Sequence, residues 1–245
     1  MRAQARVVAE ADGAGGTRLA VLRGQAPLLL RRTGPPAGDR VAVHLVGGAA
    51  GPLRGDELSL RIEVGPGARL SLFSVAAQLA LPGRPAPASR LTVEATVAAG
   101  GTLRWLPQPL IAAAGCDHVA VTRVAVAAGG SLLWRDDLVC GRHGEVAGDF
   151  VADTLISYAG RALYRHELAV GPRAAGWAGP AVLGGGRAVG TLVAAGPDLA
   201  GFGATPPAGP DAAVMPLAGP GVLATAVGPD IRTVQAALDP LCRRR

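Results

Sequence analysis

Apolar and polar residues alternate along most of the chain, and the runs are interrupted by glycine and proline. Alternation with a period of two is typical of β-strands that bury one face. The runs that show it, or that are rich in β-forming residues, are 5–8, 17–22, 27–30, 41–46, 155–158, 163–170 and 188–193. Segments 81–87 and 172–181 carry turn residues and are expected to be loops. The pattern predicts a mainly β protein.

A repeated unit occupies the middle of the chain. Its three copies read IEVGPGARL at 62–70, ATVAAGGTL at 95–103 and VAVAAGGSL at 124–132. Their turn glycines, Gly67, Gly100 and Gly129, are 33 and 29 residues apart. Glycine supplies the positive φ of a tight turn, and a period near 30 is typical of stacked units. We therefore expect stacked β-hairpins in two layers of sheet, similar to a β-helix.

Helical spacing occurs only near the C-terminus. Ile231, Val234 and Leu238 fall on one face of a helix, and Asp230 is a suitable N-cap. Residues 211–217 are expected to form a second short helix or a loop. The whole chain, 1–245, reads as a single domain, β-rich over 1–205 and partly helical over 206–245, with one or two C-terminal helices.

The composition excludes several classes of function. The chain has 245 residues, of which 49% are hydrophobic, enough for a sizeable core. Its formal charge of +6 comes from arginine alone, because the sequence has no lysine. A Walker phosphate loop and a Schiff-base nucleophile are therefore absent. Aromatic residues make up 3%, too few for a base-stacking surface, so no nucleic-acid partner is expected. The arginines are spread along the chain, which indicates genome composition rather than a selected basic patch.

Cysteine usage and hydropathy indicate a cytoplasmic protein. The three cysteines are an odd number without framework spacing, which favours free thiols in a reducing compartment. Neither a secretory signal nor an uninterrupted apolar span is apparent, so no membrane association is expected.

Polar side chains are densest between residues 126 and 153. Two Cys/His pairs, Cys116 with His118 and Cys140 with His143, suit zinc or nickel, although buried cysteines and surface histidines are the favoured interpretation. Five carboxylates could bind a cation, line a polar channel or form a solvated face with neighbouring arginines, and the solvated face is favoured. They are Asp136, Asp137, Glu145, Asp149 and Asp153. No catalytic constellation is recognisable.

Four motifs over residues 40–170 together resemble the UreD (UreH) family of urease accessory proteins. The first is Gly55-Asp56 followed by the VGPGARL turn at 64–70, and the second is LRWLPQPLI at 103–111. The third is the GSLLW strand at 130–134, and the fourth is Gly141-Arg-His-Gly-Glu145 followed by Gly148.

The resemblance implies a non-catalytic scaffold and metallochaperone, not an enzyme. Such proteins act with UreF and the GTPase UreG, in a dimeric UreD–UreF–UreG complex docked on apo-urease, to deliver nickel. No cofactor is bound tightly; nickel passes transiently along a polar internal route. Candidate route residues are Asp56 and Glu145, with Cys140 and His143 as local additions. Motif residues with a structural role are Gly55, Trp105, Pro107, Pro109, Gly141, Arg142 and Gly144. The alternative is a metal-dependent hydrolase that uses the carboxylates between Asp136 and Asp153.

Overall fold

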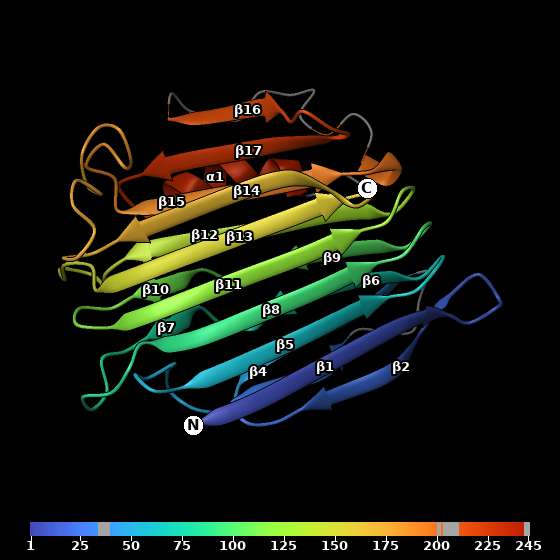
Figure 1. Ribbon diagram of the computed structural model, residues 1–245, viewed down its shortest axis with the longest axis horizontal. Coiled ribbons are helices and arrows are strands. Elements are labelled where there is room, and N and C mark those ends of the chain that lie inside the picture. The colour runs from blue at the N-terminus through green and yellow to red at the C-terminus, as the bar shows by residue number, and fades with distance from the viewer. Residues whose placement is uncertain (34–39, 200–201, 203–210, 243–245) are drawn as a thin grey trace.

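Two β-sheets face each other across a common core, with one helix outside (Figure 1). The computed structural model describes residues 1–33, 40–199, 202 and 211–242. The first sheet has the order β14 (Arg161–Val170), β13 (Asp149–Tyr158), β11 (Asp117–Val126), β8 (Ser89–Val97), β5 (Glu57–Val64), β1 (Arg2–Ala11) and β2 (Thr17–Gly24). The second has the order β16 (Ala212–Pro216), β17 (Gly221–Gly228), β15 (Ala188–Ala195), β12 (Ser131–Cys140), β9 (Thr102–Leu106), β6 (Arg69–Ser74), β4 (Arg40–Gly47) and β3 (Leu28–Thr33). The short strands β7 (Gln78–Ala80) and β10 (Leu110–Ala112) extend it beside β12.

The repeated unit builds the centre of both sheets. The expected glycine turns are present, with φ of 68° at Gly67, 71° at Gly100 and 78° at Gly129. The structure differs from the expected hairpins in one respect, because the turn joins two strands that lie in different sheets. Equivalent strands of successive copies pair in parallel: β5 pairs with β8 and β8 with β11, while β6 pairs with β9 and β9 with β12. The mainly β, two-layer, β-helix-like fold is confirmed.

The two ends of the chain extend these sheets. The expected hairpin of β13 and β14 and the strands β4 and β15 are present. Residues 211–217 are neither helix nor loop: β16 pairs antiparallel with β17, and this ladder satisfies its backbone groups. Residues 206–210 lie outside the described part. The predicted helix is α1 (Ile231–Cys242), and the Asp230 carboxylate caps it by accepting the Thr233 N–H at 2.9 Å.

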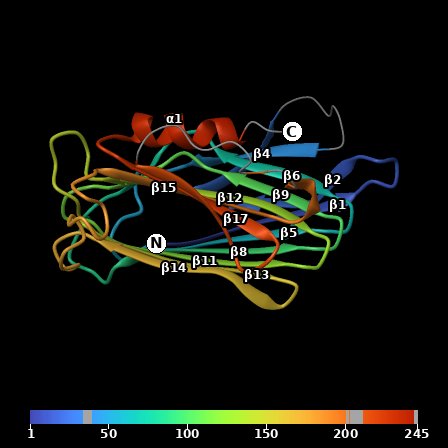
Figure 2. The same ribbon diagram turned by 90° about the horizontal axis from the view of Figure 1, so that it is seen from above.

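Helix α1 covers part of the outer face of the second sheet (Figure 2). Val234 and Leu238 are fully buried there against β15 and β17. The approach is close at Gly190, where a Cβ atom would lie 2.6 Å from Val234 Cγ1. The inner faces hold the main core, in which Trp105 and Trp134 stack with ring centroids 5.1 Å apart. Within the described part, no helix is long and apolar enough to cross a bilayer.

Candidate functional site

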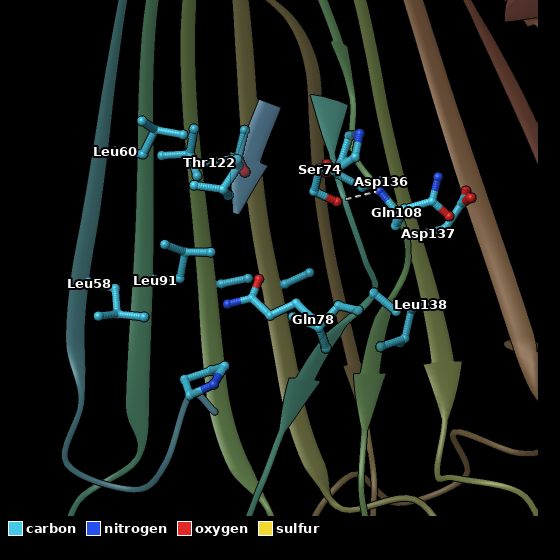
Figure 3. A pocket seen from close by; sticks show the side chains of 18 of the residues that line it. Leu58, Leu60, Ser74, Gln78, Leu91, Gln108, Thr122, Asp136, Asp137 and Leu138 are labelled. Carbon is cyan, nitrogen blue, oxygen red and sulfur yellow. Dashed lines mark hydrogen bonds between the residues drawn. The ribbon is translucent and has the colours of Figure 1, made fainter. Parts of the chain in front are cut away.

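A cavity of about 500 Å³ lies between the two sheets (Figure 3). Leucines make up much of its wall, including Leu58, Leu60 and Leu91 from the first sheet. Polar groups interrupt this apolar lining on both sides. On the side of the first sheet they include Asp56, in the loop before β5, and Thr122, Thr154, Tyr164 and His166. On the side of the second sheet they include Gln78, Asp136, Thr191 and Gln108, which lies in the loop between β9 and β10.

Asp136 presents an acidic group to this cavity. Alternation along β12 points Trp134 and Asp136 to the inner face together. The carboxylate accepts hydrogen bonds from the indole N–H groups of Trp134, at 2.8 Å, and Trp105, at 3.4 Å. Burial nevertheless raises the pKa of Asp136 to about 6, because the two indole bonds offset only part of the lost hydration. The carboxyl group is enclosed by protein, whereas Asp136 as a whole residue is only partly buried.

Tyr164 and His166 approach the cavity from the edge strand β14. Their rings stack with centroids 5.8 Å apart. Burial raises the pKa of the Tyr164 phenol, and the negative charge of Asp136 raises it further, so the two groups are within electrostatic reach of each other. Burial also lowers the pKa of His166, although one side of the residue is exposed to solvent. His166 is therefore one point at which the cavity wall reaches solvent, at the edge of the first sheet.

Asp56 lies on the cavity wall as well, in the loop before β5. Only 4% of this residue is exposed. Its carboxylate accepts a 2.9 Å hydrogen bond from the Leu53 N–H and pairs with the N-terminal ammonium of Met1. Asp56 therefore lies on the cavity wall with its charge already compensated.

Glu145 is outside the cavity wall and organises the loop between β12 and β13. It accepts a 2.8 Å hydrogen bond from Arg142 Nε, and this contact is the main reason why the pKa of Glu145 falls to about 2. The backbone N–H groups of Ala114 and Arg142 also point to its carboxylate. Gly141 and Gly144 have φ of 84° and 76°, and a Cβ at Gly141 would lie 2.7 Å from the carbonyl oxygen of Val146. The motif thus builds a tight loop.

The Cys/His pairs do not converge on one point. Burial raises the pKa of Cys116 and of Cys140 to about 11, so both thiols are protonated near neutral pH. His118 is fully buried, its Nδ1 lies 2.8 Å from the Ser89 hydroxyl, and burial lowers its pKa to about 4. His143 is exposed on the loop after β12. The described residues contain no group of three or more His, Cys, Asp and Glu side chains placed to hold a metal ion.

The five carboxylates of the polar segment also diverge. Asp149 pairs with Arg173, Asp153 with Arg123 and Arg165, and Glu145 with Arg142, so the expected solvated face is correct for these three. It is wrong for Asp136, which faces the cavity, and for Asp137. The cause is that β12 lies between the first sheet on one side and α1 on the other, so neither face of this strand is solvated.

Asp137 belongs to a buried ion pair beneath α1. Arg135 Nη2 lies 2.8 Å from Asp137, and Arg135 Nη1 lies 2.6 Å from Asp239 of the helix. Burial alone would lower the pKa of Arg135, but the Asp137 charge and these hydrogen bonds outweigh it and raise the pKa. A hydrolase centre built from the segment's carboxylates lacks the required convergence.

The remaining motif residues support the cavity. Trp105 and Pro107 line it, and the Pro109 carbonyl accepts a 3.0 Å hydrogen bond from Gln78. Gly55 has φ of 82° and donates to the Pro87 carbonyl at 2.8 Å, which fixes the loop before Asp56.

Sequence reasoning missed several of the polar lining residues. Thr122 lies in phase with the inward-facing Val124 and Val126 of β11, and Thr154 lies in phase with Ile156 of β13. A polar residue at an apolar position of an alternating strand was the available signal.

Comparison with known proteins gives one consistent result. The family described as UreD urease accessory protein matches residues 1–244. Urease accessory protein UreD 3 of Streptomyces griseus subsp. griseus is 47% identical over 250 residues, covering 99% of this chain and 96% of its own length. Urease accessory protein UreD of Streptomyces coelicolor is 46% identical over 244 residues (98% and 94%), and that of Frankia alni is 42% identical over 280 residues (98% and 92%). The likeness thus extends well beyond the four motifs, and the chain belongs to the UreD urease accessory protein family.

Proposed function

We propose that this protein delivers nickel to apo-urease as a non-catalytic, cytoplasmic partner of UreF and the GTPase UreG, and that the ion crosses it through the cavity between the sheets. The observation that carries the proposal is the Asp136 carboxyl group on the cavity wall. Nickel is the cargo of this process and not a resident cofactor.

The chemistry of Asp136 suits a cation in transit. With a pKa of about 6, the carboxyl group exchanges its proton near neutral pH, and an entering cation replaces that proton. The cavity wall also carries neutral oxygens, the hydroxyls of Thr122, Thr154 and Thr191. An open site of this kind binds a borderline cation weakly, in contrast to a closed set of four ligands. Weak binding permits release, which a carrier requires.

The mouth of the cavity supplies a second suitable group. His166 lies at the opening on β14, and burial lowers its pKa, so its imidazole is neutral and able to bind near pH 7. Imidazole is a favourable nickel ligand. The proposed route runs from His166 past Tyr164 to Asp136 and on toward Asp56. Glu145 contributes by ordering the loop after β12, and Cys140 and His143 stand apart from the route.

The test is co-expression of urease and its accessory proteins with the wild-type chain, without it, or with Asp136→Asn. The nickel content of purified urease and its ureolytic rate are measured, and a pull-down checks that the complex still assembles. We expect little activation without the chain and a nickel content reduced roughly tenfold with Asp136→Asn, the effect of losing about 1.4 kcal/mol of ion binding.

Asp153→Asn is the matched control, because Asp153 pairs with arginines on the outer face of the first sheet. It is expected to leave nickel transfer at the wild-type level. Full activation without the chain would refute the accessory role. Wild-type transfer by an assembled Asp136→Asn complex would refute the route.

A further inference from the structure

The outer face of the second sheet is basic where α1 does not cover it. The helix packs over β12, β15 and β17, and β9, β6, β4 and β3 lie beyond it. These four strands contain no aspartate or glutamate. In the first sheet, by contrast, β1, β5, β8, β11, β13 and β14 each contain at least one. The acidic residues of the protein are therefore unevenly divided between its two broad faces.

Strand register gathers four arginines on this face. Arg31 pairs with His44 across β3 and β4, Arg40 pairs with Arg69 across β4 and β6, and Arg104 pairs with Ser71 across β6 and β9. Their strand neighbours, including Val41, Val43, Leu70, Leu103 and Trp105, point inward to the core. Because side chains alternate along a strand, the arginines point outward. We call Arg31, Arg40, Arg69 and Arg104 the arginine face.

Contacts in the described part of the chain compensate part of the charge of this face. Arg69 lies 3.3 Å from Asp198, and Arg104 donates to the carbonyl oxygen of Cys242. The Nε atoms of Arg40 and Arg104 are buried and have no hydrogen-bond partner in the described part of the chain. Burial lowers the pKa of Arg104, and the positive charge of Arg40 lowers it further, so these guanidinium groups repel each other. A carboxylate placed between them would supply both the acceptor and the opposite charge.

An aromatic pair adds a packing surface among these arginines. His44 and Phe73 stack with ring centroids 5.1 Å apart, and His44 Nδ1 lies 2.6 Å from the Thr33 hydroxyl. Because Phe73 already stacks on His44, it is poorly placed to stack on a nucleobase. The combination of forked cationic donors and a small apolar platform matches a peptide with carboxylates and apolar side chains.

We propose that the arginine face docks an acidic segment of a partner protein. The inference concerns the outer surface of the second sheet and is independent of any ion route through the cavity. On the first sheet, by contrast, several arginines already form ion pairs with acidic residues of the same sheet, such as Arg6 with Glu63 and Arg123 with Asp153.

Binding of a fluorescent glutamate-rich decapeptide to the purified full chain tests the proposal. We expect saturable binding at about 50 mM salt that weakens steeply as salt is raised, since the contacts are ionic. Arg40→Glu and Arg31→Glu should each weaken binding roughly tenfold, because reversal adds a repulsion to the lost attraction. Arg31 is exposed, so Arg31→Glu remains informative if Arg40→Glu fails to fold.

Arg23→Glu is the matched control, since Arg23 is an exposed arginine on β2 of the first sheet. It should change peptide affinity less than twofold. Absence of peptide binding, or equal weakening by Arg23→Glu and Arg31→Glu, would overturn the proposal. A single-stranded oligonucleotide is tested in the same way. If it binds more tightly than the peptide, and Arg31→Glu abolishes that binding, the ligand of this face is a nucleic acid and the proposal is overturned.

Discussion

The indole nitrogen of Trp134 donates a 2.8 Å hydrogen bond to the carboxylate of Asp136, two residues further along the same strand. Both side chains point into the space between the sheets, so the donor and the acid share one environment. The bond stabilises the ionised form, while burial favours the neutral form. The balance leaves Asp136 able to titrate near physiological pH.

Asp136 should make the protein less stable as pH rises. Its folded pKa of about 6 lies above the ordinary value of 3.8, so between these values the folded state binds more protons than the unfolded state. The Asp136 contribution to the free energy of unfolding therefore falls as pH rises from about 4 to about 6, by about 3 kcal/mol in total. Urea denaturation from pH 4.5 to 7 should show about two thirds of this loss in the wild type and its absence in Asp136→Asn.

Asp153→Asn provides a control, because the Asp153 contribution to the free energy of unfolding changes with pH in the opposite direction. Arg123 lowers the pKa of Asp153, so its contribution to stability is present above the unfolded pKa and is lost as pH falls. A wild type and an Asp136→Asn variant with the same pH dependence would contradict the assignment of the titration to Asp136.

The indole bonds to Asp136 should have unequal effects. Trp134→Phe removes the 2.8 Å bond and Trp105→Phe the 3.4 Å bond. Both should raise the pKa of Asp136, Trp134→Phe by roughly one unit, since a hydrogen bond to a charged group contributes about 1.5 kcal/mol or more. Carboxyl-carbon NMR titration measures the shift. Trp177→Phe, in the loop after β14, should leave this pKa unchanged, and an equal shift in all three variants would count against the bonds.

The sequence indicated some of these features and concealed others. The copies around Gly67, Gly100 and Gly129 predict stacked strand pairs, but a glycine turn fits a hairpin and a crossing between sheets equally well. Only the pairing partner, about 30 residues away, distinguishes them. Asp136 was identifiable as a polar residue in phase with Trp134, whereas Tyr164 and His166 lie on an edge strand with polar residues on both faces.

The arginine face was not predictable, because its residues come from four separate segments. Arg31, Arg40, Arg69 and Arg104 look dispersed along the chain, and only strand register brings them together. Distances along the sequence carry little information about charge distribution when strands from distant segments pair.

Gly190 should be essential for the docking of α1. A Cβ there would lie 2.5 Å from Asp137 Oδ1 and 2.7 Å from Leu238 Cδ1, closer than packed atoms allow. Gly190→Ala should lower the free energy of unfolding by about 1–3 kcal/mol, the usual cost of overpacking. Chemical denaturation measures the change. At Gly47 a Cβ would meet no atom closer than 3.9 Å, so Gly47→Ala should be close to neutral; similar losses at both positions would contradict a specific contact with α1.

The ion pairs beneath α1 should respond differently according to which partner is removed. Arg135 is 6% exposed and contacts both Asp137 and Asp239. Arg135→Met leaves the buried Asp137 charge without its cation, so we expect a loss of about 3–5 kcal/mol in the free energy of unfolding. The Asp239 side chain is 41% exposed, and water can replace much of its contact, so Asp239→Asn should cost about 1 kcal/mol or less.

A double variant separates the ion pair from simple packing. Arg135→Met with Asp137→Leu removes both buried charges and should be more stable than Arg135→Met alone, because no unpaired carboxylate remains. Urea denaturation of the wild type, of Arg135→Met, of Asp137→Leu and of the double variant gives the comparison. If the double variant loses as much as the sum of its single changes, the two residues act independently, and the charge of Asp137 is not what makes Arg135 necessary.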